Sequence, residues 1–301
     1  MNTKTKGILS YLLIAFGGAW TVWVLLWLLG VSPTRTSLQF QLLSLPAEFA
    51  PAIAAVIVRL WVTRERFTDA GMRLHVREKW PYYLFAWVMP LFVIGMIVAL
   101  AAVLGVGRAD FSFQRALGLL SPGLTLSPGI LAGVLLSPLL LAFVQTPLLW
   151  GEEFGWRGYL QLRLLRHRPL RAAVTTGLIW GIWHYPAILL GYEQYSNVLL
   201  GLLTFPILTV LLSIIFGWLR LRTGSIWSAS LAHAAFNSIG GTFTGLLFLG
   251  GADFALVGSN GILAWIPLGV VCVWIVFTGQ LQLETARTPP RIFQAEKEAL
   301  R

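Results

Sequence analysis

Residues 132–157 read AGVLLSPLLLAFVQTPLLWGEEFGWR, an apolar run that ends in two carboxylates, Glu152 and Glu153, and a cation, Arg157. A membrane-spanning helix needs about 20 consecutive apolar residues, so this run is long enough to cross a bilayer. Acidic side chains at or inside a membrane boundary are costly to keep there, and by default they mark a functional site. The stretch therefore predicts a membrane helix that carries a functional acid near one end.

Seven further apolar runs fill most of the rest of the chain. The protein has 301 residues, of which 57% are hydrophobic and 11% charged, whereas about a quarter of a soluble domain is charged. We predict an all-α, polytopic membrane bundle of about eight transmembrane helices. Residues 1–283 form its single domain and residues 284–301 a short polar cytoplasmic tail. The predicted spans are 8–30, 40–62, 81–105, 132–154, 172–191, 198–219, 226–248 and 261–282.

The net charge of +10 does not indicate nucleic-acid binding, because the basic residues occupy alternate loops. Such loops face the cytoplasm, where they meet anionic lipid headgroups. We therefore expect both termini in the cytoplasm and a multi-pass protein of the plasma (inner) membrane. Cys272 is the only cysteine, which excludes an intramolecular disulfide and a cysteine metal cluster. The basic clusters are Lys4 with Lys6, and residues 59–79, 157–171, 220–222 and 287–301.

Three pairs of residues with helical spacing lie on three of the predicted spans. Residues four apart share a helix face, whereas Glu152 is offset by one position from the first pair. If the fourth span continues to about residue 163, Glu152, His184 and His233 lie roughly 16, 18 and 10 Å from the cytoplasmic helix ends. They are expected to line one cavity that opens toward the cytoplasm. The pairs are Glu153 with Arg157, Trp180 with His184, and His233 with Asn237.

These residue types suit hydrolysis inside a membrane. A carboxylate and a histidine can polarise a water molecule and take its proton. A second histidine and an amide can donate hydrogen bonds to the oxyanion that forms when this water attacks a carbonyl. Glu152, His184 and His233 are also typical zinc ligands, with water in the fourth position. A zinc site and a metal-independent site therefore both stay open, and no other cofactor is indicated.

Other interpretations of the same residues stay open as well. Glu153 and Arg157 can form a structural ion pair, and a single buried histidine is more often an interhelical contact. Buried acids and histidines also build the proton relays of transporters, and a polar cavity can bind a peptide in a non-enzymatic immunity or scaffold protein. Glu48, near the start of the second span, is expected at the outer interface. The chain contains no His-Glu-x-x-His and no Gly-x-Ser-x-Gly motif, which disfavours two other protease chemistries.

At the three pairs the sequence resembles the CPBP family of intramembrane proteases. This family includes the type II CAAX prenyl protease and bacterial bacteriocin-processing or self-immunity proteins. Its motifs Glu-Glu-x-x-x-Arg, aromatic-x-x-x-His and His-x-x-x-Asn all match here, in order and on separate spans. The aromatic residue is most often Phe in the family and is Trp180 in this chain. The resemblance covers residues 150–240 and implies an eight-helix membrane fold.

The resemblance also implies roles for these residues. Glu152 resembles the general base, acting with His184 on the water, and His233 and Asn237 resemble the oxyanion-side pair. Glu153, Arg157 and Trp180 resemble supporting residues. Members of the family have been described both as metalloproteases and as metal-independent glutamate proteases. The implied function is an endopeptidase that cuts a membrane-associated or prenylated (CAAX-type) peptide near the cytoplasmic face. The implied partners are that lipidated substrate and membrane lipids.

Overall fold

A computed structural model describes residues 2–31, 38–121, 123, 126–164, 168–191, 195 and 197–281. All regular structure within these ranges is helical, which confirms the predicted all-α class. The predicted tail at 284–301 lies outside the described residues. The helices are α1 (Thr3–Leu28), α2 (Leu38–Ile57), α3 (Val76–Leu104), α4 (Gln114–Leu120), α5 (Pro128–Gly155), α6 (Gln161–Leu164), α7 (Pro169–Trp183), α8 (Tyr185–Leu189), α9 (Val198–Thr223), α10 (Ile226–Ala235), α11 (Gly241–Phe248), α12 (Phe254–Val257) and α13 (Trp265–Phe277).

Four short turns join or extend these helices. Three are π-helical, with one residue more per turn than the α-helix. They are η1 (Val58–Val62), η2 (Trp156–Leu160) and η3 (Phe236–Gly240), and the fourth, η4 (Ile262–Ala264), is a 3-10 turn. Because η2 follows α5 without a break and leads into α6, the fourth predicted span continues as helix to Leu164. This confirms the continuation on which the predicted depth of Glu152 depends.

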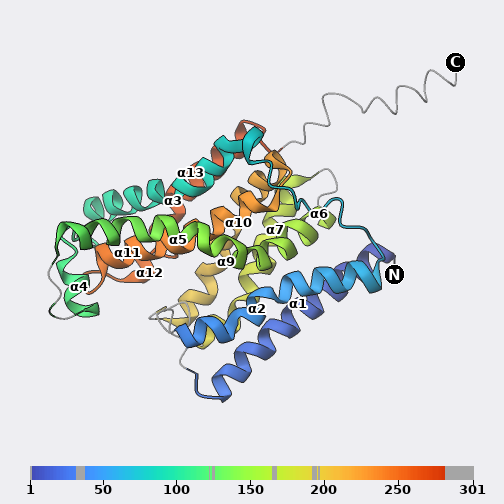
Figure 1. The fold of residues 1–301 in the computed structure, drawn as a ribbon, viewed down its shortest axis with the longest axis horizontal. Helices are drawn as coiled ribbons and strands as arrows, with labels where there is room; N and C mark the ends of the chain where they lie inside the picture. The colour runs from blue at the N-terminus through green and yellow to red at the C-terminus, as the bar shows by residue number, and fades with distance from the viewer. Residues whose placement is uncertain are drawn as a thin grey trace.

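The helices that carry the predicted site lie at the centre of the bundle. The α1–α2 pair packs along one side and α3 and α13 lie at the opposite side (Figure 1). Between them, α5 packs against both α2 and α10, and α7 packs against α9. Of the three motif-bearing helices, α10 is almost completely buried, whereas α5 is buried mainly in its last turns, where the first motif lies, and α7 is buried along one face.

Within the described residues, six helical segments are long and apolar enough to cross a membrane, so the chain is a multi-pass helical membrane protein, as predicted. Two predicted spans, 172–191 and 226–248, are not among them. The first is broken, because α7 has only 15 residues and a span needs about 20. The second carries His233, Asn237 and several Ser and Gly residues, which make it less apolar. The six segments are Thr3–Leu28, Gln39–Val62, Val76–Leu104, Pro128–Leu164, Val198–Thr223 and Phe254–Phe277.

A network of charged residues closes the end of the bundle at which residues 63–75 connect η1 to α3. Arg59 is completely buried, and its Nη1 donates to Oδ1 of Asp69 at 2.8 Å while its Nη2 donates to the carbonyl oxygen of Gly158 at 2.9 Å. Arg163 on α6 donates to Oδ2 of Asp69 at 2.8 Å and pairs with Glu65. The connection between η1 and α3 is thereby tied to the helix that extends the motif region.

This network predicts a pH-dependent stability. Partial burial alone would raise the pKa of the Asp69 carboxyl, but hydrogen bonds and charges from Arg59 and Arg163 hold that pKa below its usual value. A carboxyl whose pKa is lowered by folding contributes stability above its unfolded pKa, about 3.9, and loses it as the pH falls through the folded value. We expect Asp69→Asn to lower the stability at pH 7 by under about 1 kcal/mol, because Asp69 is half exposed.

The measurement is thermal unfolding in detergent at pH 7 and at pH 3, with Glu78→Gln as the control. Glu78 lies in the first turn of α3, outside the network. The gap between wild type and Asp69→Asn is expected to close at pH 3. A gap of the same size at both pH values would contradict the assignment.

Candidate active site

The first motif sits in the last turn of α5, where two glycines let α2 approach closely. A Cβ atom on Gly155 would lie 2.4 Å from Cβ of Pro51 and 2.6 Å from the hydroxyl oxygen of Tyr11, and one on Gly151 would lie 2.9 Å from the ring of Phe49. Any side chain at Gly155 would therefore push α1 and α2 away. The close contact keeps the adjacent Glu152 and Glu153 in the protein interior.

Glu153 joins two elements of the predicted site. Its Oε1 accepts a hydrogen bond from Nη1 of Arg157 at 2.8 Å, which confirms the predicted pair. The same oxygen accepts from Nδ1 of His233 on α10 at 3.0 Å. Because a carboxylate only accepts, Nδ1 is the protonated nitrogen of His233. Glu153 therefore anchors a residue of the third motif as well as the arginine of its own.

Glu152 points away from Glu153, as the helical offset predicts. Its Oε2 accepts from the indole Nε1 of Trp180 at 2.7 Å and more weakly from that of Trp156 at 3.4 Å. Both bonds fall on one oxygen, so Oε1 is the atom that can take a proton from a water molecule. Trp156 was not predicted as a site residue, although its position four residues after Glu152 places it on the same helix face.

His184 lies at the break between α7 and α8. Its Nδ1 is 2.9 Å from the carbonyl oxygen of Trp180. A carbonyl can only accept, so Nδ1 carries the proton and the neutral ring has its acceptor on Nε2. The rings of Trp183 and Phe205 pack against the imidazole, each with a centroid distance of 4.8 Å. The backbone break and these rings fix the orientation of the imidazole.

Trp180 contacts every part of this cluster. Besides its bond to Glu152, its ring lies 5.1 Å from that of His233 and 5.8 Å from that of His184, between centroids. The Arg157 guanidinium stacks over the same ring at 4.6 Å, a cation–π contact. The predicted contact between Trp180 and His184 is confirmed. The indole N–H donates a hydrogen bond to Glu152, which a phenylalanine at this position could not do.

Trp180→Phe tests this hydrogen bond. The substitution keeps an aromatic ring beside His233 and removes the donor to Glu152. A hydrogen bond to a charged group contributes about 1.5–3 kcal/mol, so we expect kcat/KM for peptide hydrolysis to fall about 10- to 100-fold. Trp274→Phe on α13 removes an indole far from the cluster and serves as the matched control. Equal activities of the two variants would contradict a role for the indole N–H.

The third motif lies where α10 passes into the π-turn η3. His233 lies in α10 and is buried, and Asn237 lies in the π-turn η3, which follows α10 without a break. Asn237 is exposed, and its side chain makes no hydrogen bond within the described part of the chain. His233 is buried whereas Asn237 is exposed, so the two side chains differ in environment, and their role as an oxyanion-side pair stays a prediction.

Glu48 was expected at the outer interface, apart from the site. It lies ten residues into α2, and the neighbouring Phe49 packs against Gly151 of α5, the residue before Glu152. Oγ of Ser44 donates to its carboxylate at 3.1 Å. The signal that could have identified it is the one used for Glu152, an acid within an apolar helix. The site thus contains a third carboxyl group, supplied by α2.

The predicted zinc ligands do not form a metal site in this arrangement. Within the described residues, no three His, Cys, Asp or Glu side chains come together as a group that could hold a metal ion. Nδ1 of His233 is engaged with Glu153, and Oε2 of Glu152 with Trp180. The residues are therefore arranged around hydrogen bonds, and the zinc site stays a prediction.

Comparison with known proteins covers this same region. Residues 128–239 match the family described as Type II CAAX prenyl endopeptidase Rce1-like. This match runs from the start of α5 into η3 and includes all three motifs. CAAX prenyl protease 2 of Methanococcus maripaludis is 32% identical over 92 residues, which cover 29% of this chain and 34% of that protein. The similar region therefore spans about a third of the relative's length.

Proposed function

We propose that this chain, whose residues 128–239 match the Type II CAAX prenyl endopeptidase Rce1-like family, is an intramembrane protease of the CPBP family and hydrolyses a peptide bond of a membrane-associated or prenylated, CAAX-type peptide. The observation that carries the proposal is the link between Glu152 and His184 through one residue. Trp180 donates its indole N–H to Glu152, and its carbonyl oxygen accepts from His184. Two groups that can take a proton from water are thereby oriented by the same side chain and its backbone.

In the proposed reaction, a water molecule lies between Oε1 of Glu152 and Nε2 of His184. Glu152 takes one proton as the water oxygen bonds to the carbonyl carbon of the scissile peptide. The carbonyl oxygen becomes an oxyanion, which needs hydrogen-bond donors. The C–N bond then breaks, and the proton held by Glu152 passes to the leaving amine. The new carboxylic acid gives up its proton to the new amine through solvent, so that the products are a carboxylate and a protonated amino terminus.

His233 can act on the oxyanion only in one protonation state of its ring. Its Nδ1–H donates a hydrogen bond to Glu153. In the neutral ring, Nε2 is therefore an acceptor. His233 can donate through Nε2 to an oxyanion only when both ring nitrogens are protonated. Asn237 would supply the second donor, after a rotation of its exposed side chain.

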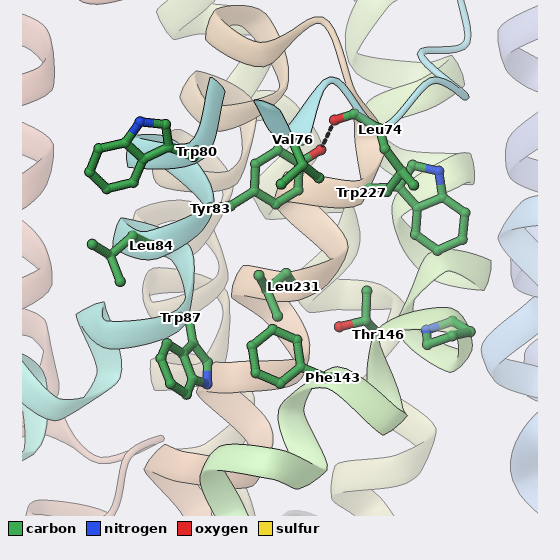
Figure 2. Close-up of a pocket in the computed structure, with 11 residues that line it drawn as sticks. Leu74, Val76, Trp80, Tyr83, Leu84, Trp87, Phe143, Thr146, Trp227 and Leu231 are labelled. Carbon is green, nitrogen blue, oxygen red and sulfur yellow. Dashed lines mark hydrogen bonds between the residues drawn. The ribbon is translucent and has the colours of Figure 1, made fainter. Parts of the chain in front are cut away.

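An apolar groove supports a lipidated substrate rather than a soluble peptide. It has a volume of about 410 Å³ and lies between α3, α5 and α10. Figure 2 shows Trp80, Trp87, Phe143 and Leu231 around it, with Thr146 at its edge. The groove shares α10 with His233 and α5 with Glu153. We propose that it takes the lipid chain of a substrate that enters from the plane of the plasma membrane, with the cut made near the cytoplasmic face.

Thr146→Trp, which fills the groove, tests this part of the proposal. Each buried CH2 group contributes about 0.8 kcal/mol, so displacing two of them is expected to raise KM for a farnesylated peptide about tenfold. KM for an unprenylated peptide should not change. Val144→Trp is the matched control, since Val144 lies on the same helix, is exposed and does not line the groove. Equal KM changes for both peptides would place the lipid chain elsewhere.

The activity itself is tested with purified protein in detergent and a panel of peptides. The panel contains a farnesylated Cys-a-a-X peptide and its unprenylated twin, and mass spectrometry of the products locates the cut. A parallel sample with a chelator separates metal-dependent from metal-independent hydrolysis. No cleavage of any peptide by protein shown to be folded would overturn the proposal in favour of a peptide-binding immunity or scaffold protein. Substrate-dependent proton flux in liposomes would instead indicate a transporter.

A further inference from the structure

A polar cavity lies far from the motif residues, at the end of the bundle where α3, α4 and α11 meet. Its volume is about 590 Å³. The helix from α10 through η3 to α11 is continuous, and the end of α11 is fifteen residues beyond His233, roughly 20 Å along the helix axis. Figure 1 shows α4 at this end of the bundle and α6 toward the other. The cavity therefore cannot belong to the candidate active site.

Glycines leave the space in this cavity open. Gly105 and Gly250 have positive φ angles of 68° and 69°, which L side chains rarely adopt. A Cβ atom on Gly251 would lie 1.8 Å from Nη1 of Arg115, and one on Gly107 would lie 2.8 Å from Cβ of Ala252. The Arg115 guanidinium consequently lies directly on the backbone of Gly251, and a side chain at this position would displace it.

Two guanidinium groups make the cavity cationic. Arg108 and Arg115 both line it, and none of the described residues that line it is acidic. Neither arginine forms an ion pair within the described part of the chain. Asp110 is close enough to interact with the charge of Arg115. However, its carboxylate accepts from Ser112 and from the backbone N–H of Arg115 instead of pairing with the guanidinium.

Two exposed apolar side chains lie on the chain segments that form the cationic cavity. Val103 at the end of α3 is 83% exposed and Phe111 is 70% exposed. Because α3 is one of the membrane-crossing segments, its end lies where hydrocarbon gives way to headgroups. A ligand at this position meets arginines in the cavity and apolar side chains beside it. This combination fits an amphiphile with an anionic head and not a free ion in water.

We propose that this cavity binds the phosphate of an anionic membrane phospholipid. The planar guanidinium groups of Arg108 and Arg115 match phosphate oxygens through paired N–H donors. The glycines let the headgroup approach the backbone, and the acyl chains run along the exposed end of α3. The lipid would therefore contact both the segment that follows α3 and the segment that follows α11.

The test is native mass spectrometry of the full chain in detergent, titrated with short-chain phosphatidylglycerol, with phosphatidylcholine of the same chain length, and with inorganic phosphate. We expect phosphatidylglycerol to bind at least about tenfold more tightly than phosphatidylcholine and to raise the thermal unfolding midpoint. The double variant Arg108→Gln/Arg115→Gln should lose both effects. Arg77→Gln/Arg171→Gln, which removes two exposed cations elsewhere, should keep them.

Three results would overturn the proposal. They are equal binding of the two lipids, an unchanged phosphatidylglycerol affinity in the Arg108→Gln/Arg115→Gln variant, and a shift with inorganic phosphate as large as that with lipid. The last result would identify a site for a small free anion instead. Peptide hydrolysis is not used as a readout, so failure of this proposal is distinct from failure of the proposed function.

Discussion

Glu152→Gln is expected to abolish peptide hydrolysis, with a fall in kcat/KM of about a thousandfold. General base catalysis by a positioned side chain contributes about 10²- to 10⁴-fold, and an amide cannot take a proton from water at neutral pH. The glutamine oxygen can still accept the hydrogen bond that Trp180 gives to Glu152. The variant should therefore fold normally and keep its affinity for the peptide while it loses turnover.

The measurement compares single-turnover cleavage by the two proteins at equal folded concentrations. Glu78→Gln is the control for loss of a carboxyl group, because Glu78 is exposed in the first turn of α3. Hydrolysis at the wild-type rate by Glu152→Gln would remove Glu152 from the reaction. Peptide binding without hydrolysis by the wild-type protein would favour a binding scaffold.

Glu153→Ala is expected to have the largest effect on stability. Arg157 is completely buried and is paired with Glu153 at 2.8 Å. Removing one partner of a buried ion pair leaves an uncompensated charge and costs about 3–5 kcal/mol. We expect the variant to unfold at a much lower temperature in detergent or to fail to accumulate. Wild-type stability of this variant would show that the pair does not support the fold.

A double variant separates the stability of the pair from its role in the site. Glu153→Leu/Arg157→Met removes both charges, and such replacements are often neutral for stability. The protein should then fold, but His233 loses the carboxylate that accepts from its Nδ1. We expect kcat/KM to stay at least about tenfold below wild type, because one charge-assisted hydrogen bond is missing. Full activity in the double variant would mean that His233 is oriented by other contacts.

Contacts within one helix were predictable from the sequence, and contacts between helices were not. The Glu153–Arg157 pair and the contact of Trp180 with His184 follow from a spacing of four residues. The hydrogen bond from His233 to Glu153 depends on how α10 lies against α5. The proximity of Glu48 depends on how closely α2 approaches α5. Neither relation is recorded in the spacing of residues along the chain.

The number of membrane spans stays a prediction at two of the eight segments. All eight predicted segments are helical where described, yet only six qualify as spans by length and hydropathy. The other two contain His184, and His233 with Asn237. The residues that identify a functional site are polar, and the break at His184 shortens its helix. The polar residues of the site therefore lower the mean hydropathy of the two segments that carry them. Hydropathy alone does not identify these two segments as membrane spans.

The π-turn η2 constrains how this protein can be recombined with its relatives. It lies between Glu153, which holds the site together, and Arg163, which pairs with Glu65 and Asp69 at the end of the bundle. A π-turn contains one residue more than an α-turn, so shortening it by one residue would rotate Arg163 by about 100° relative to Glu153. Chimeras with crossover points inside residues 152–163 should therefore lose either the site or the network. Crossovers placed before α5 or after α6 keep both in register.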